Sequence, residues 1–320
     1  MSDTPTLSVV ATLYKSAAYV EEFCARITSE ARKITSEYEI VLVDDGSPDN
    51  ALDVALGVVA RDPHVRVVEL SRNFGHHKAM MTGLCHTRGE FVFLIDIDLE
   101  EPPELLGLFY ERMRAENWDV VYGYQRRRKG GWWEQVSGAL AWRMINFMLP
   151  IHVPDNHSTV RLMTRTYVDA LVQHKENKTA IGGLWVITGF RQHGVEFVKG
   201  QRPVSSYTLL GRLSMLLDSI TSFSEVPLFA IFFLGLAILL TSLVFAAYLV
   251  VLHFTGRSLA GWISVMVSVW ILGGLGIFSV GVVGLYVSRI FIETKGRPYT
   301  IVRRLHGNVA PRAIEEQVKS

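Results

Sequence analysis

Carboxylates gathered at the end of an apolar run are the part of this sequence best suited to chemistry. The run Phe91–Ile95 stops at Asp96 and Asp98, and a third acid follows at Glu100 before two prolines. Alternate side chains of an extended backbone share one face, so Asp96 and Asp98 can converge on one ligand. Hard divalent cations such as Mg²⁺ and Mn²⁺ take oxygen ligands. The pair therefore indicates a metal site, although an acidic turn that caps the next helix would use the same residues.

Strand-like and helix-like segments alternate around these acids. Continuous apolar, β-branched runs predict buried strands, and amphipathic periods predict the helices between them. Strands that are apolar on both faces and alternate with helices are typical of an α/β fold with a mostly parallel sheet. The expected strands are 7–13, 39–43, 65–70, 90–95 and 119–124, and the expected helices are 19–36, 48–60 (with Ser47 as N-cap), 78–86 and 103–117.

Polar residues collect at the carboxyl ends of the expected strands. Asp44 and Asp45 follow the second strand, Arg72 follows the third, and Asp96 and Asp98 follow the fourth. Ligands of open parallel sheets bind at this edge, so the clustering favours a binding site over chance placement. The first strand–helix turn has no glycine-rich dinucleotide fingerprint, and the chain has no Gly-Lys-Ser/Thr phosphate loop.

The charge balance and the cysteine and histidine patterns argue against several classes of protein. Lys+Arg of 32 and Asp+Glu of 31 leave no net charge that would point to nucleic acid as a partner. Cys24 and Cys85 fit no metal spacing and are expected to be free thiols in a reducing compartment. The ten histidines include no pair with the spacing of a zinc hydrolase.

Two long uncharged runs, 227–254 and 259–288, predict a transmembrane helical hairpin. Each run lacks Asp, Glu, Lys and Arg and exceeds the roughly 20 residues that cross a bilayer; two buried core helices are the alternative. Basic residues outside the hairpin place both termini and the N-terminal part in the cytoplasm of a multi-pass protein of the cell membrane. The N-terminus has no signal-peptide pattern.

Two further segments are expected to lie at the membrane surface. Trp132–Leu149 carries apolar residues at helical spacing beside the basic loop Arg126–Lys129, and Tyr207–Phe223 leads directly into the first span. Aromatic and basic residues together suit a helix at the headgroup boundary. A core helix and a solvated basic turn are the alternatives for the earlier segment.

Glycines on one half of the second span predict a close helix neighbour. Small residues on one face let membrane helices approach each other closely. The neighbour would be the first span or another subunit, which would make the protein a homo-oligomer. The glycines are Gly273, Gly274, Gly276, Gly281 and Gly284.

Taken together, several segments resemble the polyprenyl-phosphate glycosyltransferases, a branch of the family 2 glycosyltransferases with the GT-A fold. The two spans also stand where the bacterial undecaprenyl-phosphate transferases have theirs. The matching segments, in family order, are Ser8–Val10, Val43–Ser47, Ser71–Gly75, Asp96–Glu104, Arg161–Met163 and Lys295–Tyr299. The expected organisation is a Rossmann-like GT-A catalytic domain (1–204), an interfacial helix (205–226), two transmembrane helices (227–254 and 259–288) and a cytoplasmic tail (289–320).

The resemblance also implies roles for individual residues. Asp96 and Asp98 would hold the donor diphosphate through Mg²⁺ or Mn²⁺, and Glu100 would be a further metal contact where the family usually has Gln. The residues that would bind the nucleotide-sugar are Thr12, Tyr14, Asp44, Asp45, Arg72 and Asp96. The acceptor phosphate would be held by Arg126, Arg127, Arg128, Arg161 and Arg202, and the catalytic residues would be Asp96, Asp98, Arg128, Arg161 and Arg202.

The implied reaction is inverting transfer of a sugar from a nucleotide-sugar, with a UDP-sugar favoured, to undecaprenyl phosphate at the membrane. The family also implies a homotetramer.

The chain departs from the family where Thr12–Ser16 replaces Pro-x-Tyr-Asn-Glu, where Thr159 replaces an aspartate, and where Ser206 replaces a lysine. A phosphate nucleophile is already anionic at neutral pH, so the loss of a general base at Thr159 is tolerable.

Two other functions are compatible with parts of the sequence. A processive polysaccharide synthase would share the catalytic domain, but it would carry a Gln-x-x-Arg-Trp motif and more spans, which this chain lacks. A membrane-anchored, non-catalytic sugar-nucleotide binder would explain Thr159 and the changes at Lys15 and Ser16. The Asp96 and Asp98 pair and the basic loop argue against that second alternative.

Overall fold

The computed structural model describes residues 5–125, 157–174, 176, 181–200 and 261–307, together with 228, 231, 233–238, 240, 241, 244 and 248. The chain forms two compact units. The first unit holds residues 1–143, 151–209 and 298–320, and the second holds 144–150 and 210–297. The C-terminal segment therefore returns to the unit in which the chain begins.

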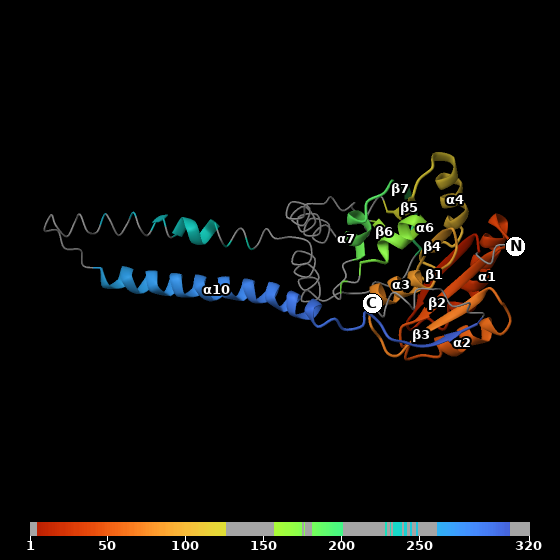
Figure 1. The fold of residues 1–320 in the computed structure, drawn as a ribbon, viewed down its shortest axis with the longest axis horizontal. Coiled ribbons are helices and arrows are strands. Elements are labelled where there is room, and N and C mark those ends of the chain that lie inside the picture. The colour runs from red at the N-terminus through yellow and green to blue at the C-terminus, as the bar shows by residue number, and fades with distance from the viewer. Residues whose placement is uncertain are drawn as a thin grey trace. The chain divides into compact units, whose positions relative to one another are not determined.

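Strands and helices alternate through residues 7–124, as the sequence predicts (Figure 1). The first and third strands have the predicted bounds, and the other bounds differ from the prediction by a few residues. The elements are β1 Leu7–Leu13, α1 Val20–Ile34, β2 Tyr38–Asp44, α2 Ala51–Val59, β3 Val65–Leu70, α3 His76–Cys85, β4 Phe91–Leu94, α4 Leu105–Glu116 and β5 Val120–Tyr124.

Three more strands complete an eight-stranded sheet, and two of them, β6 and β8, run against the other strands. The three are β6 His157–Thr164, β7 Gln192–Glu196 and β8 Val302–His306. The order is β7-β5-β6-β4-β1-β2-β3-β8. The central strands β4, β1, β2 and β3 run parallel, but β6 is antiparallel to β4 and β5, and β8 is antiparallel to β3. The sheet is therefore mixed, with a parallel centre.

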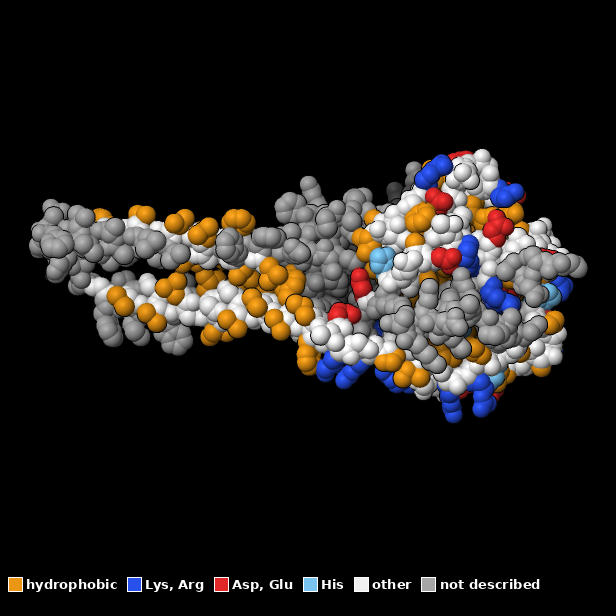
Figure 2. Space-filling view, in the orientation of Figure 1, with side chains coloured by type: hydrophobic (Ala, Val, Ile, Leu, Met, Phe, Trp, Pro, Cys, Tyr) orange, Lys and Arg blue, Asp and Glu red, His pale blue; other side chains and the backbone are white. Residues whose placement is uncertain are grey.

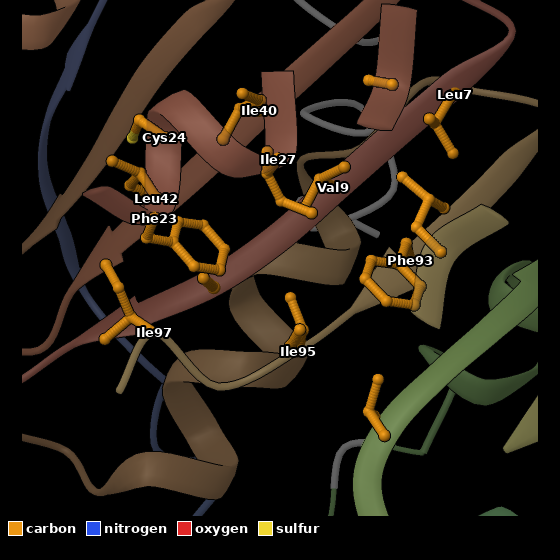
Figure 3. Packing of buried hydrophobic residues seen from close by; sticks show 14 of the residues in the cluster. Leu7, Val9, Phe23, Cys24, Ile27, Ile40, Leu42, Phe93, Ile95 and Ile97 are labelled. Atoms are coloured by element: carbon orange, nitrogen blue, oxygen red, sulfur yellow. The ribbon is translucent and has the colours of Figure 1, made fainter. Parts of the chain in front are cut away.

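Helices cover both faces of the parallel centre. On one face, Phe23 and Ile27 of α1 pack with Val9 of β1 and Leu42 of β2 in a fully buried cluster, which α4 extends (Figure 3). On the other face, Gly83 of α3 lies so close that a Cβ there would stand 2.5 Å from a methyl carbon of Val10. Burial on both faces explains why these strands have no polar alternation in sequence.

The expected cytoplasmic tail, 289–320, contains part of the sheet. Strand β8 lies along the β3 edge, and Glu69 of β3 pairs with two of its side chains. His306 Nε2 is 2.9 Å and Arg303 Nη1 is 3.2 Å from the Glu69 carboxylate. The pairing covers an edge strand whose backbone groups would otherwise be open to other chains.

One long helix of the second unit fits a membrane span. Helix α10 covers Trp262–Thr294, so it extends beyond the expected end at residue 288. Among the described residues, Leu272–Thr294 is the one segment long and apolar enough to cross a bilayer. Exposed hydrophobic side chains gather along it, including Ile277, Val280 and Phe291 (Figure 2).

The other membrane segments are described in part or not at all. The described residues of 227–254, such as 233–238, are helical, but the structure does not describe a complete hairpin. The expected interfacial helices, 132–149 and 207–223, lie outside the described residues.

The predicted cap of α2 is wrong. The N-cap is Asn50, and the helix begins at Ala51 rather than at residue 48. Ser47 is used elsewhere: its backbone N–H donates to Asp44 Oδ1 at 3.2 Å, and its hydroxyl accepts the Lys15 N–H at 2.8 Å. These bonds join the turns that follow β1 and β2. The Ser47 hydroxyl also donates to Asp49 Oδ1, which accepts the Ala51 N–H at the start of α2.

Candidate functional site

The carboxyl ends of the parallel strands form one edge, and the candidate site is built on it. Strand β2 ends at Asp44 and β4 at Leu94, and both pair in parallel with β1. The turns that follow β1, β2, β3 and β4 therefore leave the sheet on the same side. The predicted residues on these turns or strand ends are Thr12, Tyr14, Asp44, Asp45, Arg72, Asp96, Asp98 and Glu100.

Asp45 joins the turn after β2 to the start of α3. Its carboxylate accepts the N–H of Phe74 at 2.7 Å and of Gly75 at 3.0 Å, and the residue is 2% exposed. Gly46 has a φ of +63°, and a Cβ there would lie 2.6 Å from the Asn73 nitrogen. Only glycine fits this contact without a backbone shift. The two turns are thus locked together at the edge where a nucleotide is expected.

Burial is the largest influence on the pKa values of the two acids in this turn. It raises the pKa of Asp44, aided by the charges of Glu69 and Asp45, against the hydrogen bonds from Ser47 and Gly46. It also raises the pKa of Asp45, against the hydrogen bonds from the Phe74 and Gly75 N–H groups and the charges of His76 and Arg72. Both carboxylates therefore gain from a positively charged or hydrogen-bonding ligand.

Asp96 faces a histidine that is not among the predicted site residues. Its Oδ1 is buried and lies 3.2 Å from His76 Nε2, and the other ring nitrogen lies 3.0 Å from Thr12 Oγ1. The contact with His76 is at ion-pair distance, but Oδ1 has no well-aligned hydrogen bond from the described residues. Such a buried oxygen can accept a further ligand.

The protonation of His76 follows from its acidic surroundings. Burial lowers the pKa of the imidazole, but the bond to Asp96 and the charges of Asp96, Asp45 and Asp98 together raise it above its usual value. When protonated, the ring donates from both nitrogens, to Asp96 and to Thr12. His76 is the first residue of α3, directly after the Ser71–Gly75 segment, and this position is the signal that could have identified it.

Asp98 and Glu100 lie on a tight turn beyond β4. Leu99 has a φ of +60°, and Asp98 Oδ1 accepts the Glu100 N–H at 3.1 Å. Burial raises the pKa of Asp98, and the charges of Asp96 and Glu100 add to this effect. Glu100 Oε2 lies 2.9 Å from Lys199 Nζ. The predicted third metal contact thus has a lysine partner in this structure.

Glu101 is an acid of the site that was not among the predicted site residues. The residue is fully buried, and its Oε1 accepts a hydrogen bond from the Ser158 hydroxyl. Burial raises its pKa to about 7, and the nearby charge of Asp96 adds to the shift. Glu101 Oε2 has no hydrogen-bond partner among the described residues.

Arg161 is buried beneath the site rather than exposed at its rim. It lies on β6 opposite Leu94 and is 1% exposed. Its guanidinium donates to the backbone oxygens of Thr159 at 3.2 Å and Ser158 at 3.3 Å, and it stacks 3.0 Å from the Trp185 ring centroid. Burial lowers its pKa to about 9. In this structure, the backbone carbonyls of Ser158 and Thr159 and the ring of Trp185 stabilise the charge of Arg161.

The remaining predicted residues are exposed or outside the described part. Tyr14 is 47% exposed, and the Arg72 guanidinium stacks 4.1 Å from the Phe74 ring. Both are accessible at the sheet edge. Arg126, Arg127, Arg128 and Arg202 lie outside the described residues.

The described residues fit a divalent cation through two carboxylates. No group of three or more His, Cys, Asp or Glu in the described residues is arranged to hold a metal ion. Mg²⁺ sites, however, commonly use one or two carboxylates with substrate phosphates and water as the other ligands. Asp96, whose buried Oδ1 has no well-aligned hydrogen bond from the described residues, and Asp98 supply such a pair.

Comparisons with known proteins identify the family of this chain. The family model "Glycosyl transferase family 2" matches residues 8–172. A "Putative glycosyltransferases" protein of Mycobacterium tuberculosis is 50% identical over 94% of this chain and 89% of its own length. The uncharacterized glycosyltransferase YkcC of Bacillus subtilis is 31% identical over 97% of both chains. A prophage-derived bactoprenol glucosyl transferase of Shigella flexneri is 30% identical over 84% of this chain and 88% of its own.

Proposed function

Because this chain belongs to glycosyl transferase family 2, we propose that it transfers a sugar from a UDP-sugar to a polyprenyl phosphate such as undecaprenyl phosphate. The observation that carries the proposal is the Asp96 and Asp98 pair at the carboxyl edge of the sheet, in a chain that also has the apolar helix α10. The bactoprenol glucosyl transferases among its relatives support a lipid phosphate as acceptor. The reaction would take place at the cytoplasmic face of the cell membrane.

The donor would lie along the turns of the sheet edge. Asp44, Asp45 and Arg72 would bind the nucleotide, together with Thr12 near the end of β1 and Tyr14 just after it. Asp96 and Asp98 would hold Mg²⁺ or Mn²⁺, with Glu100 as a further ligand. When bound, the cation would stabilise the charge that develops on the leaving diphosphate.

The acceptor needs positive charge more than it needs a base. A lipid phosphate is anionic at neutral pH, so no strong general base is required, and Thr159 is consistent with this. Attack in line with the leaving diphosphate would invert the anomeric centre and give a β-linked product from an α-linked donor. Arginines suit a phosphate because their planar donors match its oxygens. The candidates are Arg126, Arg127, Arg128 and Arg202. Arg161, which is 1% exposed, would act from beneath the site rather than by direct contact with the phosphate.

Replacing Arg128 by alanine should raise the apparent KM for the lipid acceptor by about tenfold or more, because a charged hydrogen bond to phosphate contributes about 1.5–3 kcal/mol. The KM for the nucleotide-sugar should change less. Steady-state kinetics in mixed micelles would measure both constants. Arg114→Ala, at an exposed position in the last turn of α4, is the matched control. A larger change in the donor KM would assign Arg128 to the other phosphate.

The proposed function is tested by a screen of nucleotide-sugars with undecaprenyl phosphate and Mg²⁺ or Mn²⁺. Mass spectrometry of the lipid fraction should detect a polyprenyl-phosphate-sugar with one donor, and EDTA should remove the product. Hydrolysis of a donor without a lipid product, or transfer to a growing polysaccharide, would contradict the proposed acceptor.

A further inference from the structure

Few positively charged side chains of the described residues contact the acidic segment of the site. Four acids, Asp96, Asp98, Glu100 and Glu101, occur within six residues. His76 contacts Asp96, on the α3 side. On the other side Lys199 contacts Glu100, with 2.9 Å between Nζ and Oε2. The ion pair with Lys199 engages the one acid that is also the expected third metal contact.

The backbone fixes Lys199 at this place. The N–H of the next residue, Gly200, donates to the Glu100 carbonyl oxygen at 2.7 Å. A Cβ at Gly200 would stand only 3.3 Å from that oxygen, so a larger residue would press on the Glu100 backbone. The backbone of Lys199 therefore belongs to a segment that contacts the acidic turn. This segment follows β7 in the chain.

The ion pair is within reach of solvent and of a ligand. The Lys199 side chain is 31% exposed and that of Glu100 is 18% exposed. Burial lowers the pKa of Lys199, but the bond to Glu100 and the charges of Glu101, Glu100 and Asp96 raise it overall, so the amine is charged. Lysine is a compact charge on a flexible stem, so its amine can move while the backbone contact at Gly200 remains.

We propose that Lys199 is an exchangeable counter-ion of the site: it pairs with Glu100 in the metal-free protein, and it releases Glu100 and contacts the diphosphate when the metal and nucleotide bind. This inference rests on the proposed function. A dication held by Asp96 and Asp98 would attract Glu100 and repel the ammonium, because Coulomb energies scale with the charges involved. The diphosphate provides negative oxygens at which the released amine is stabilised. Lys199 would then be a positioning residue for Glu100 and a contact for the donor.

The test is a pair of binding measurements on the full chain in detergent. Free Mn²⁺ is followed by its electron paramagnetic resonance signal without nucleotide, and UDP binding is then measured at saturating Mn²⁺. Lys199→Met, which keeps the stem and removes the charge, should bind Mn²⁺ about three- to fivefold more tightly without nucleotide and UDP about three- to tenfold more weakly. Lys199→Arg, which keeps the charge, should lie closer to the wild type in both measurements.

A matched control removes a similar ion pair just beyond the acidic turn. Arg26 Nη2 lies 2.8 Å from Glu104 Oε2, and Arg26→Met should change neither affinity. If Lys199→Met leaves Mn²⁺ affinity unchanged or weaker, or leaves UDP affinity unchanged, the exchange is overturned while the metal site stands. If the wild type binds no Mn²⁺, with or without UDP, both the metal site and the exchange are overturned.

Discussion

Asp98→Ala should lower sugar transfer to polyprenyl phosphate by at least about a hundredfold, since comparable losses follow removal of a single group that stabilises developing charge. Asp98 is one of the two carboxylates that fit a cation, and in the described part of the chain no larger group of metal-ligating side chains shares that role. The fold should survive, because Asp98 lies on a turn outside the apolar core and its hydrogen bond from the Glu100 N–H is local. Transfer of radiolabelled sugar in membranes would measure the effect.

Two further variants separate charge from structure in this experiment. Asp98→Asn keeps an oxygen that can accept the Glu100 N–H, so it should remain as stable as the wild type and yet lose activity. Glu104→Gln removes an exposed acid that pairs with Arg26 just beyond the turn and should retain activity. Undiminished transfer by Asp98→Ala would remove the metal-site proposal.

The parallel centre of the fold could be predicted because it is buried on both faces. β1 and β3 have the predicted bounds because every residue of each strand is buried and the residue that follows, Tyr14 or Ser71, is exposed. The outer strands β7 and β8 read Gln-His-Gly-Val-Glu and Val-Arg-Arg-Leu-His and are partly exposed. Their pairing depends on partners far along the chain, which no local pattern encodes. The places of these two strands in the sheet were therefore beyond the prediction.

Some residues of the candidate site could likewise be predicted from the sequence and others could not. Asp96 and Asp98 could be identified because an apolar strand ends just before them. The expected extended backbone is not present there, since β4 ends at Leu94 and both acids lie in the segment beyond it. Lys199 and Glu101 could not, because each matters through a contact that forms only in the folded chain. For His76 the sequence offers only its position directly after Ser71–Gly75, and its contact with Asp96 likewise forms only on folding. Nothing in the residues around Arg161 indicates that its side chain is fully buried.

A second network of buried charges lies at the opposite edge of the sheet. Glu39, near the start of β2, is 4% exposed, and its carboxylate accepts the Ser8 hydroxyl at 2.6 Å and the Arg88 N–H at 2.7 Å. Arg66 Nη2 lies 2.8 Å from Glu39 Oε2, and Arg66 is itself 6% exposed. Burial lowers the pKa of Arg66, and the Glu39 charge opposes that shift. The Glu39 carboxylate therefore pairs with both Arg66 and Arg88 and links β1, β2, β3 and the turn before β4.

Glu39→Ala should destabilise the first unit by about 3–5 kcal/mol, because it leaves a buried arginine without its counter-charge. In a domain of this size that loss lowers the midpoint of thermal unfolding by about 10 °C, which differential scanning fluorimetry would detect. Glu39→Gln should lie between alanine and wild type, since its oxygen can still accept the Ser8 and Arg88 bonds.

The control for this variant is an exposed ion pair of the same unit. Glu22→Ala, which removes an exposed partner of Arg26, should cost less than about 1 kcal/mol. An equal, small change for Glu22 and Glu39 would show that the buried network adds nothing beyond a surface pair. Below the melting temperature Glu39→Ala should transfer sugar normally per folded molecule, because its network lies at the amino end of the strands and Asp96 and Asp98 lie at the carboxyl end.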